Sequence, residues 1–241
     1  MKICTVSTPV GIVNSIDNDY FSSQLKELGM YAEQSVIDEY LMPYVKSART
    51  ILDIGGHVGY HTLAYKKINS KVKIHTFEPQ KELFELLNKN ITVNNINDVF
   101  TYNLAVGHVN SKITLGDTIY DGPNANIPFN YDSSDIFNLG GVSIGFGNKE
   151  IDMITLDSMN FKDVDYIKVD VEGAETLVFL GAIELISKYK PTICFEYNHK
   201  KIEPNFLEYI GKKDLESPIE VLKNIGYTTF KEIPYENILC T

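Results

Sequence analysis

The sequence predicts an α/β protein with a mostly parallel β-sheet that is covered by helices on both faces. Two observations support this prediction. Apolar segments of strand length alternate with longer segments of helical periodicity between residues 50 and 196, and strands joined through helices pair in parallel. A glycine-rich break at Gly55, Gly56 and Gly59 also follows the first of these strands. Such a strand–loop–helix unit presents bare backbone and a helix N-terminus to a ligand.

The length, composition and charge of the chain restrict the class of protein. Its 241 residues, 44% of them hydrophobic, suit one large α/β domain. The net charge is −10 and Arg49 is the only arginine, which disfavours a nucleic-acid partner and an anionic membrane surface. The three cysteines are too far apart for a disulfide framework. The start is too polar for a secretory signal and no apolar run approaches ~18 residues, so we expect a cytoplasmic protein.

The N-terminal region, residues 1–47, is expected to form a hairpin and helices ahead of the sheet. Residues 3–6 and 10–16 are rich in β-formers around a Thr-Pro-Val-Gly turn. A polar helix is expected over 19–28, and a second helix over 32–46 because its apolar residues recur at helical spacing.

The sheet is expected to begin with a central strand at 50–54. The glycine loop and a helix lead to a second strand, Val72–Phe77, and Pro79 begins the next helix. A third strand is expected over about 99–106. The remaining elements follow a long connection, and we expect them at Val164–Asp170 (strand), Gly173–Tyr189 (helix), Thr192–Glu196 (strand), 218–225 (helix), and Tyr227–Ile233 and Asn237–Thr241 (two short antiparallel strands).

Acidic and amide side chains stand where the parallel strands end. They are Asp53, Glu78, Asp170, Glu172, Glu196 and Asn198. Ligands of open parallel sheets bind beyond the carboxyl ends of the strands, so these side chains are expected to share one crevice. Carboxylates that face one crevice repel each other unless a cation, hydroxyl groups or a metal satisfies them. A single acid at a strand end, by contrast, is commonly a helix cap or a solvated group.

The glycine loop separates two classes of nucleotide-binding protein. A dinucleotide site needs glycine at the first, third and sixth loop positions, but His57 and Tyr60 occupy two of these. The acid-x-Gly-Gly-x-x-Gly spacing resembles instead the first motif of Rossmann-like S-adenosylmethionine (SAM)-dependent methyltransferases. Glu78 lies 25 residues after Asp53 (78 − 53), a distance suited to an acid that binds both ribose hydroxyls. The alternative role for Glu78 is to cap the helix that Pro79 begins.

Successive blocks of the sequence resemble the FkbM family of methyltransferases over roughly residues 30–200. The blocks are Asp53–Gly59, Phe77–Pro79, Asn103–Val106, Thr155–Asp157, Ile167–Glu175 and Cys194–Asn198. Two positions depart from the family pattern. The family commonly has Ala-Asn in place of Gly56-His57, and often histidine in place of Ala174, which removes a candidate imidazole.

The resemblance implies a Rossmann-like (class I) methyltransferase in a single domain, 1–241, with a seven-stranded, mostly parallel sheet and an antiparallel C-terminal edge. It implies SAM as cofactor and O-methylation of a hydroxyl on a sugar or glycan, or on another small hydroxylated metabolite. Two alternatives stay open: a nucleotide- or dinucleotide-binding oxidoreductase, and a catalytically inactive binding module with the SAM fold. The oligomeric state is left open.

The resemblance and the strand ends together give the candidate site residues. The cofactor-binding candidates are Glu33, Asp53, Gly55, Gly56, His57, Gly59, Tyr60, Glu78, Pro79, Ala105 and Asp170. An alcohol is a poor nucleophile at pH 7, so a base or a metal is expected beside it. The catalytic candidates are Asp170, Glu172, Glu175, Glu196 and Lys168, with His199 as a weaker base candidate. Asp170, Glu196 and Asn198 would suit Mg²⁺ or Mn²⁺; the alternative is a hydrogen-bonded carboxylate pair without an ion.

The connection at 107–163 is 57 residues long, far beyond an ordinary crossover. It contains Tyr120, Phe129, Tyr131, Phe137 and Phe146, whereas disordered linkers are poor in aromatic residues. One interpretation is an inserted acceptor-binding segment, with Asn138–Ser143 near the cofactor and the aromatic rings stacked on a sugar. The alternative is a hairpin extension that packs these rings into a small core of its own.

Overall fold

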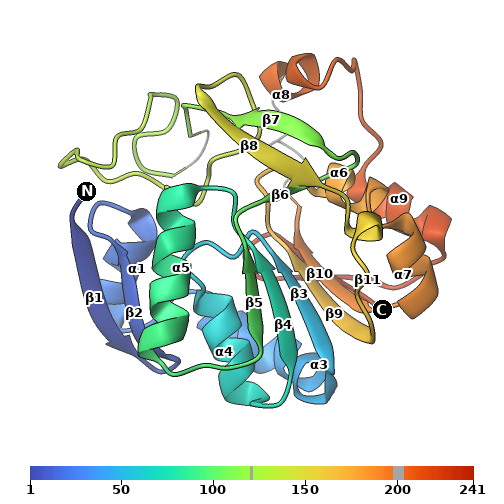
Figure 1. Ribbon diagram of the computed structural model, residues 1–241, viewed down its shortest axis with the longest axis horizontal. Helices are drawn as coiled ribbons and strands as arrows, with labels where there is room; N and C mark the ends of the chain where they lie inside the picture. The colour runs from blue at the N-terminus through green and yellow to red at the C-terminus, as the bar shows by residue number, and fades with distance from the viewer. Residues whose placement is uncertain (120–121, 198–203) are drawn as a thin grey trace.

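The computed structural model describes residues 1–119, 122–197 and 204–241. Within these residues the main sheet has seven strands in the order β11-β12-β10-β9-β3-β4-β5 (Figure 1). The sheet is mixed: the five strands from β10 to β5 run parallel, whereas β12 is antiparallel to β10 and β11 is antiparallel to β12. The strands are β3 (Thr50–Ile54), β4 (Lys73–Phe77), β5 (Val99–Tyr102), β9 (Val164–Val169), β10 (Thr192–Glu196), β11 (Phe230–Ile233) and β12 (Asn237–Cys240).

The order of the strands places a crevice above the middle of the sheet. From β3 the chain proceeds outward through β4 to β5, and then returns to the other side of β3 with β9 and β10. The direction of winding therefore reverses between β3 and β9. Helices that leave these two strands diverge to opposite faces, which opens space at their carboxyl ends.

Alternate side chains of each strand enter two separate cores. On β3, Ile51 packs with the core beneath α3 (Met42–Ser47), α4 (Tyr60–Ile68) and α5 (Lys81–Val93). Leu52 and Ile54 pack with the core beneath α6 (Glu175–Leu180), α7 (Ile183–Tyr189) and α9 (Pro218–Ile225). Strands buried on both faces explain the nearly continuous apolar runs in the sequence, and the predicted α/β class with helices on both faces is confirmed.

The N-terminal hairpin forms as predicted and packs beside α5 (Figure 1). Asn90 of α5 is buried; its Nδ2 donates to the Asn14 carbonyl at 2.9 Å, and its Oδ1 accepts from the Asn14 amide at 2.7 Å. The elements before the sheet are β1 (Ile3–Thr8), β2 (Gly11–Ile16), α1 (Tyr20–Leu28), α2 (Gln34–Val36) and the π-helical turn Ile37–Leu41, which continues into α3.

The structure divides two of the predicted elements. The third strand, expected over about 99–106, ends at Tyr102; Ala105–Val106 form β6 in a separate sheet with the order β6-β8-β7. The helix expected over Gly173–Tyr189 breaks after α6. A Cβ at Gly181 would lie 1.9 Å from the Gly107 carbonyl oxygen, so the backbone of the inserted connection occupies the side of the helix at that point.

The inserted connection lies over the carboxyl ends of the parallel strands (Figure 1). Its antiparallel strands β7 (Ser111–Leu115) and β8 (Lys149–Ile154) are connected by residues 116–148. A 3₁₀ turn at Leu156–Ser158 then leads back to β9. Helix α8 (Pro204–Tyr209) follows β10. None of the described helices has the length and apolar character needed to cross a membrane.

Candidate active site

A cavity of about 430 Å³ opens at the carboxyl ends of β3, β4, β9 and β10. Its wall combines the glycine loop, the strand-end acids, the segment around α1 and the turn between β11 and β12. The residues predicted from the sequence that line it are Glu33, Gly55, Gly56, His57, Tyr60, Glu78, Lys168, Asp170, Glu172 and Glu196. Of the strand-end residues expected to share one crevice, Glu78, Asp170, Glu172 and Glu196 do so, whereas Asp53 is not among the lining residues and Asn198 lies outside the described residues.

Close contact between two strand ends shapes the glycine loop. Gly55 has φ +85°, and a Cβ there would lie 1.7 Å from the Asp170 carbonyl oxygen. The amides of Gly55 and Gly56 donate to the Phe77 carbonyl at 3.0 and 2.8 Å. Gly59, with φ +88°, precedes the first residue of α4. Glycine is required at position 55 both by the left-handed backbone and by the lack of space for a side chain.

Asp53 lies behind the loop and is fully buried. Its Oδ2 accepts from Thr62 Oγ1 at 2.7 Å, whereas Oδ1 has no hydrogen-bond partner among the described residues. A buried carboxylate oxygen without a partner is destabilising. Asp53 lines neither the main cavity nor the pocket beside it, so its orphaned oxygen lies behind the glycine loop and does not face the cavity.

Lys168 supplies a buried positive charge among the acids. Its Nζ lies 2.8 Å from Asp170 Oδ2 and 3.5 Å from the Gly55 carbonyl oxygen. Burial opposes the charged form, but the carboxylates of Asp170, Asp53 and Glu33 outweigh it and raise the pKa of Lys168. The ammonium group is thus charged at neutral pH, and it stabilises Asp170 as a carboxylate.

Glu78 ends β4 with its carboxylate held by two backbone amides. Oε2 accepts from the His57 amide at 2.9 Å and Oε1 from the Gln80 amide at 2.8 Å. Burial raises the pKa of Glu78 to about 7, although both amides and the imidazole of His57 favour the ionised form. Helix α5 begins at Lys81, two residues after Pro79, and its N-cap Gln80 has no side-chain capping bond, so Glu78 binds the backbone just ahead of the helix and is not its N-cap.

Glu175 differs from the other catalytic candidates because it does not line the cavity. Its Oε1 accepts from the amides of Val171 and Gly173 at 3.3 and 3.2 Å, and its side chain is buried. Burial raises the pKa of Glu175 to about 7. In this geometry the carboxylate fixes the turn that carries Glu172, whose φ is +54°.

The raised pKa of Glu175 predicts a pH-dependent effect of Glu175→Gln on stability. Folding favours the protonated acid, so this contribution to stability is present below about pH 4.5 and is lost as pH rises through about 7. Glutamine keeps the acceptor for both amides without a charge. We expect the variant to be more stable than the wild type at pH 8 by roughly 1–3 kcal/mol, and equally stable near pH 4.5. Urea unfolding at both pH values measures the difference; an equal effect at both would contradict a raised pKa.

Three of the carboxylates that line the cavity lie close together. Oxygen atoms of Asp170, Glu172 and Glu196 lie within 4.8 Å of one another. Carboxylate oxygens in this number suit a hard divalent cation. Asn198 and His199, which the sequence also indicated, lie outside the described residues.

A narrow apolar slot of about 50 Å³ adjoins the main cavity and shares Gly55, Glu78 and Asp170 with it. Pro79 and Ala105, two predicted cofactor-binding residues, line this slot. The opposite wall comes from the inserted connection and consists of Leu115, Gly140, Val142 and Ile144. A flat apolar group bound here would be enclosed between the core of the sheet and the insertion.

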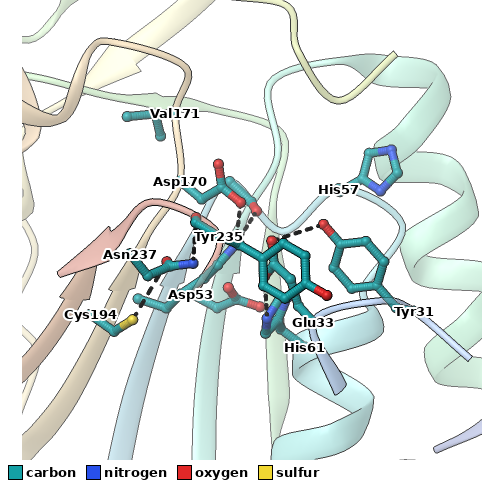
Figure 2. Close-up of polar contacts among 12 residues, drawn as sticks. Tyr31, Glu33, Asp53, His57, His61, Asp170, Val171, Cys194, Tyr235 and Asn237 are labelled. Atoms are coloured by element: carbon teal, nitrogen blue, oxygen red, sulfur yellow. Dashed lines mark hydrogen bonds and ion pairs between the residues drawn. The ribbon is translucent and has the colours of Figure 1, made fainter. Parts of the chain in front are cut away.

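Part of the cavity wall was not predicted from the sequence. Tyr20, Gln24 and Tyr31 come from the N-terminal segment, and Tyr31 donates to Glu33 Oε1 at 3.1 Å, while His61 Nε2 lies 3.4 Å from Glu33 Oε2 (Figure 2). Tyr235 and Glu236 come from the turn between β11 and β12. Because β12 runs antiparallel to β10, with Asn237 opposite Glu196, this turn arrives at the same edge as the parallel strand ends.

The aromatic residues of the insertion that the structure describes do not line the main cavity. Phe137 is buried in the core, and Phe129 and Tyr131 pack against that core, with Lys149 Nζ 4.5 Å from the Tyr131 ring centre. Phe146 is 64% exposed and contacts Tyr209. From the described part of the insertion, Asn138 and Gly140 line the main cavity; Tyr120 lies outside the described residues.

The topology, the glycine loop and the acids at the strand ends define a Rossmann-like methyltransferase fold of class I. The comparison with protein families is consistent with this class: the profile of the methyltransferase FkbM domain matches residues 53–227. The chain belongs to the FkbM methyltransferase domain family, and the family implies SAM as the cofactor.

Individual relatives are distant. "Methyltransferase 1" of Beauveria bassiana is 26% identical over 144 residues, which cover 54% of this chain and 57% of that protein. The crystal structure of an FkbM methyltransferase from Methylobacillus flagellatus superposes with a TM-score of 0.51 at 15% identity, covering 80% of this chain and 43% of that one. The Pyrococcus abyssi tRNA (uracil-54, C5)-methyltransferase, solved with S-adenosylhomocysteine, gives 0.50 at 12% identity, covering 100% of this chain and 44% of that one. These structures share the fold with this chain, which spans about half the length of such relatives.

Proposed function

We propose that this chain is a SAM-dependent O-methyltransferase that transfers a methyl group to a hydroxyl of a sugar, a glycan or another small hydroxylated metabolite. The observation that supports this most is the convergence of Glu78, Asp170 and the glycine loop on one cavity at the switch point of the sheet. These groups come from β4, β9 and β3, and their positions match the binding of one extended nucleoside ligand.

The residues present fit the cofactor along its length. The apolar slot beside Ala105 suits the adenine ring, and the Glu78 carboxylate at its edge suits the ribose hydroxyls. Asp53 lies behind the glycine loop and does not line the cavity, so it would act on the cofactor indirectly, through the loop and through Thr62 of α4, which donates to it. The carboxylates on the wall, Asp170 and Glu172 among them, favour a ligand with a positive charge.

Asp170 is our candidate for the base. When bound, the cofactor supplies an electrophilic methyl group on a sulfonium. Asp170, held at 2.8 Å by the charged Lys168, would accept the proton of the acceptor hydroxyl while the hydroxyl oxygen takes the methyl group. The carbon–sulfur bond would break in the same step and leave S-adenosylhomocysteine. Tyr20 and Tyr235 on the wall offer aromatic faces on which the apolar side of a sugar ring stacks.

A divalent cation is a second component that the site could hold. Asp170, Glu172 and Glu196 would be its ligands, and Mg²⁺ or Mn²⁺ there would lower the pKa of the acceptor hydroxyl. Methyl transfer measured after dialysis against EDTA tests whether the reaction needs a divalent cation. Loss of turnover that Mg²⁺ restores supports the cation, whereas unchanged turnover means that the carboxylates act without it.

The proposed cofactor site predicts that Asp53→Ala and Glu78→Ala each weaken binding of S-adenosylhomocysteine at least tenfold, because Glu78 is the proposed partner of the ribose hydroxyls and Asp53 supports the glycine loop from behind. Isothermal titration calorimetry measures the affinity, and circular dichroism shows whether the variants fold. Unchanged affinity in both folded variants would refute the proposed function.

A parallel titration with NAD(H) tests the oxidoreductase alternative. The acceptor is then sought by following transfer of a labelled methyl group from SAM to a panel of glycans and small hydroxylated metabolites. An inactive binding module would bind the cofactor but transfer no label to any of them.

A further inference from the structure

A buried carboxylate from the N-terminal segment reaches the glycine loop. Asp19 is 0% exposed and precedes α1, where its Oδ1 accepts from the Phe21 amide at 3.3 Å. The same oxygen accepts from the Leu139 amide at 3.2 Å, and Oδ2 lies 3.0 Å from His57 Nε2. Asp19 therefore joins three parts of the chain: the N-terminal segment, the inserted connection and the glycine loop.

The contact to His57 coincides with an unusual backbone conformation. His57 has φ +49°, a left-handed conformation that is unfavourable for a residue with a Cβ. In this conformation its amide donates to Glu78 Oε2 at 2.9 Å. Its side chain lies between Asp19 and the edge of the Phe21 ring, with ring centres 5.0 Å apart. Burial alone would lower the pKa of His57, but the carboxylates of Asp19, Glu78 and Asp170 together outweigh it and raise the pKa, which favours this ion pair.

The Oε1 atom of Glu78 is held by a residue that, like Asp19, contacts Leu139 of the inserted connection. The Gln80 amide donates to Glu78 Oε1 at 2.8 Å, and the Gln80 side chain donates to the Leu139 carbonyl at 2.8 Å. Leu139 is thus bound through its amide by Asp19 and through its carbonyl by Gln80. Both residues that orient the Glu78 carboxylate are connected to this single point on the insertion.

We propose that Asp19 is a positioning residue for the Glu78 carboxylate. Its Oδ2 atom holds His57 in the left-handed conformation that directs the His57 amide at Glu78. Its Oδ1 atom binds the inserted connection through the Leu139 amide. Asp19 does not line the cavity, so it acts on the ligand through His57. The inference rests on the proposed role of Glu78 in binding the cofactor.

The test separates backbone positioning from general loss of stability. We expect Asp19→Asn, which keeps the acceptor for the Phe21 and Leu139 amides, to weaken S-adenosylhomocysteine binding roughly five- to tenfold. His57→Ala should have a similar effect. His57→Gly should lose less affinity than His57→Ala, since glycine adopts the left-handed conformation without a side-chain anchor. In the His57→Gly background, Asp19→Asn should cause no further loss.

Asp157 provides the matched control. Its carboxylate accepts from the Glu184 and Leu185 amides at 3.0 and 2.8 Å at the start of α7, and it does not line the cavity. Asp157→Asn should lower thermal stability without changing cofactor affinity. Wild-type affinity in Asp19→Asn, or equal losses in His57→Gly and His57→Ala, would overturn the inference. Unchanged affinity in Glu78→Ala would refute the proposed function instead.

Discussion

Asp170→Asn is expected to reduce kcat by about 10²- to 10⁴-fold, the usual contribution of general acid–base catalysis, and to change cofactor affinity by less than about threefold. Asparagine keeps the size of the side chain but cannot accept the hydroxyl proton. The carbonyl of residue 170 stays in place, because its contact with Gly55 is made by backbone. Single-turnover methyl transfer, combined with calorimetry of S-adenosylhomocysteine binding, separates chemistry from binding.

The control for this variant is a second aspartate-to-asparagine change outside the cavity. Asp165 pairs with Arg49 at 2.8 Å at the opposite, amino end of β9. Asp165→Asn should leave kcat within twofold of the wild type. A wild-type rate in Asp170→Asn would remove this residue from the mechanism and direct attention to Glu172 and Glu196.

Gly55→Ala is expected to destabilise the fold by more than about 4 kcal/mol, a large fraction of the 5–15 kcal/mol typical of a domain. The new Cβ would lie 1.7 Å from the Asp170 carbonyl oxygen. That oxygen belongs to backbone, so no change of side-chain rotamer relieves the overlap. The strands would have to separate, although the Asp170 amide donates to the Ile54 carbonyl at 2.9 Å.

Gly29→Ala isolates the conformational part of this cost. Gly29 also has a left-handed backbone, φ +71°, but a Cβ there meets nothing within 4 Å. We expect a loss of only about 1–2 kcal/mol. Urea unfolding compares the two variants, and soluble yield gives a second measure if Gly55→Ala does not fold. Similar losses would show that the close approach of Gly55 and Asp170 is not a constraint.

Most of the sheet could be predicted from the sequence because it is buried on both faces. Runs such as Ile51–Ile54 and Tyr166–Val169 leave little choice of structure, and their separation by helices sets the parallel direction. Where the fold departs from the prediction, a contact between residues far apart in the sequence determines the local structure. The helix after β9 ends at Gly181 because the Gly107 backbone occupies the adjacent space, and local helical periodicity contains no trace of such a contact.

The strand-end acids could be located because one rule, the common edge of parallel strands, brings them together. Tyr235 and Glu236 reach that edge through an antiparallel return, and the same rule would have found them had it been extended to the final hairpin. Asp19 could be recognised from the sequence only as a helix cap. Its approach to His57 depends on how the N-terminal segment packs, which no local pattern encodes.

The cavity wall has a consequence for how acceptor preference can change. In the proposed function, the nucleoside end of the site is built from residues 53–172, whereas Tyr20, Tyr31 and Tyr235 on the remaining wall come from flanking segments. Exchange of the turn between β11 and β12, which carries Tyr235, would therefore alter the acceptor end of the proposed site. The N-terminal flank is less open to exchange, because Asp19 in it is proposed to position Glu78.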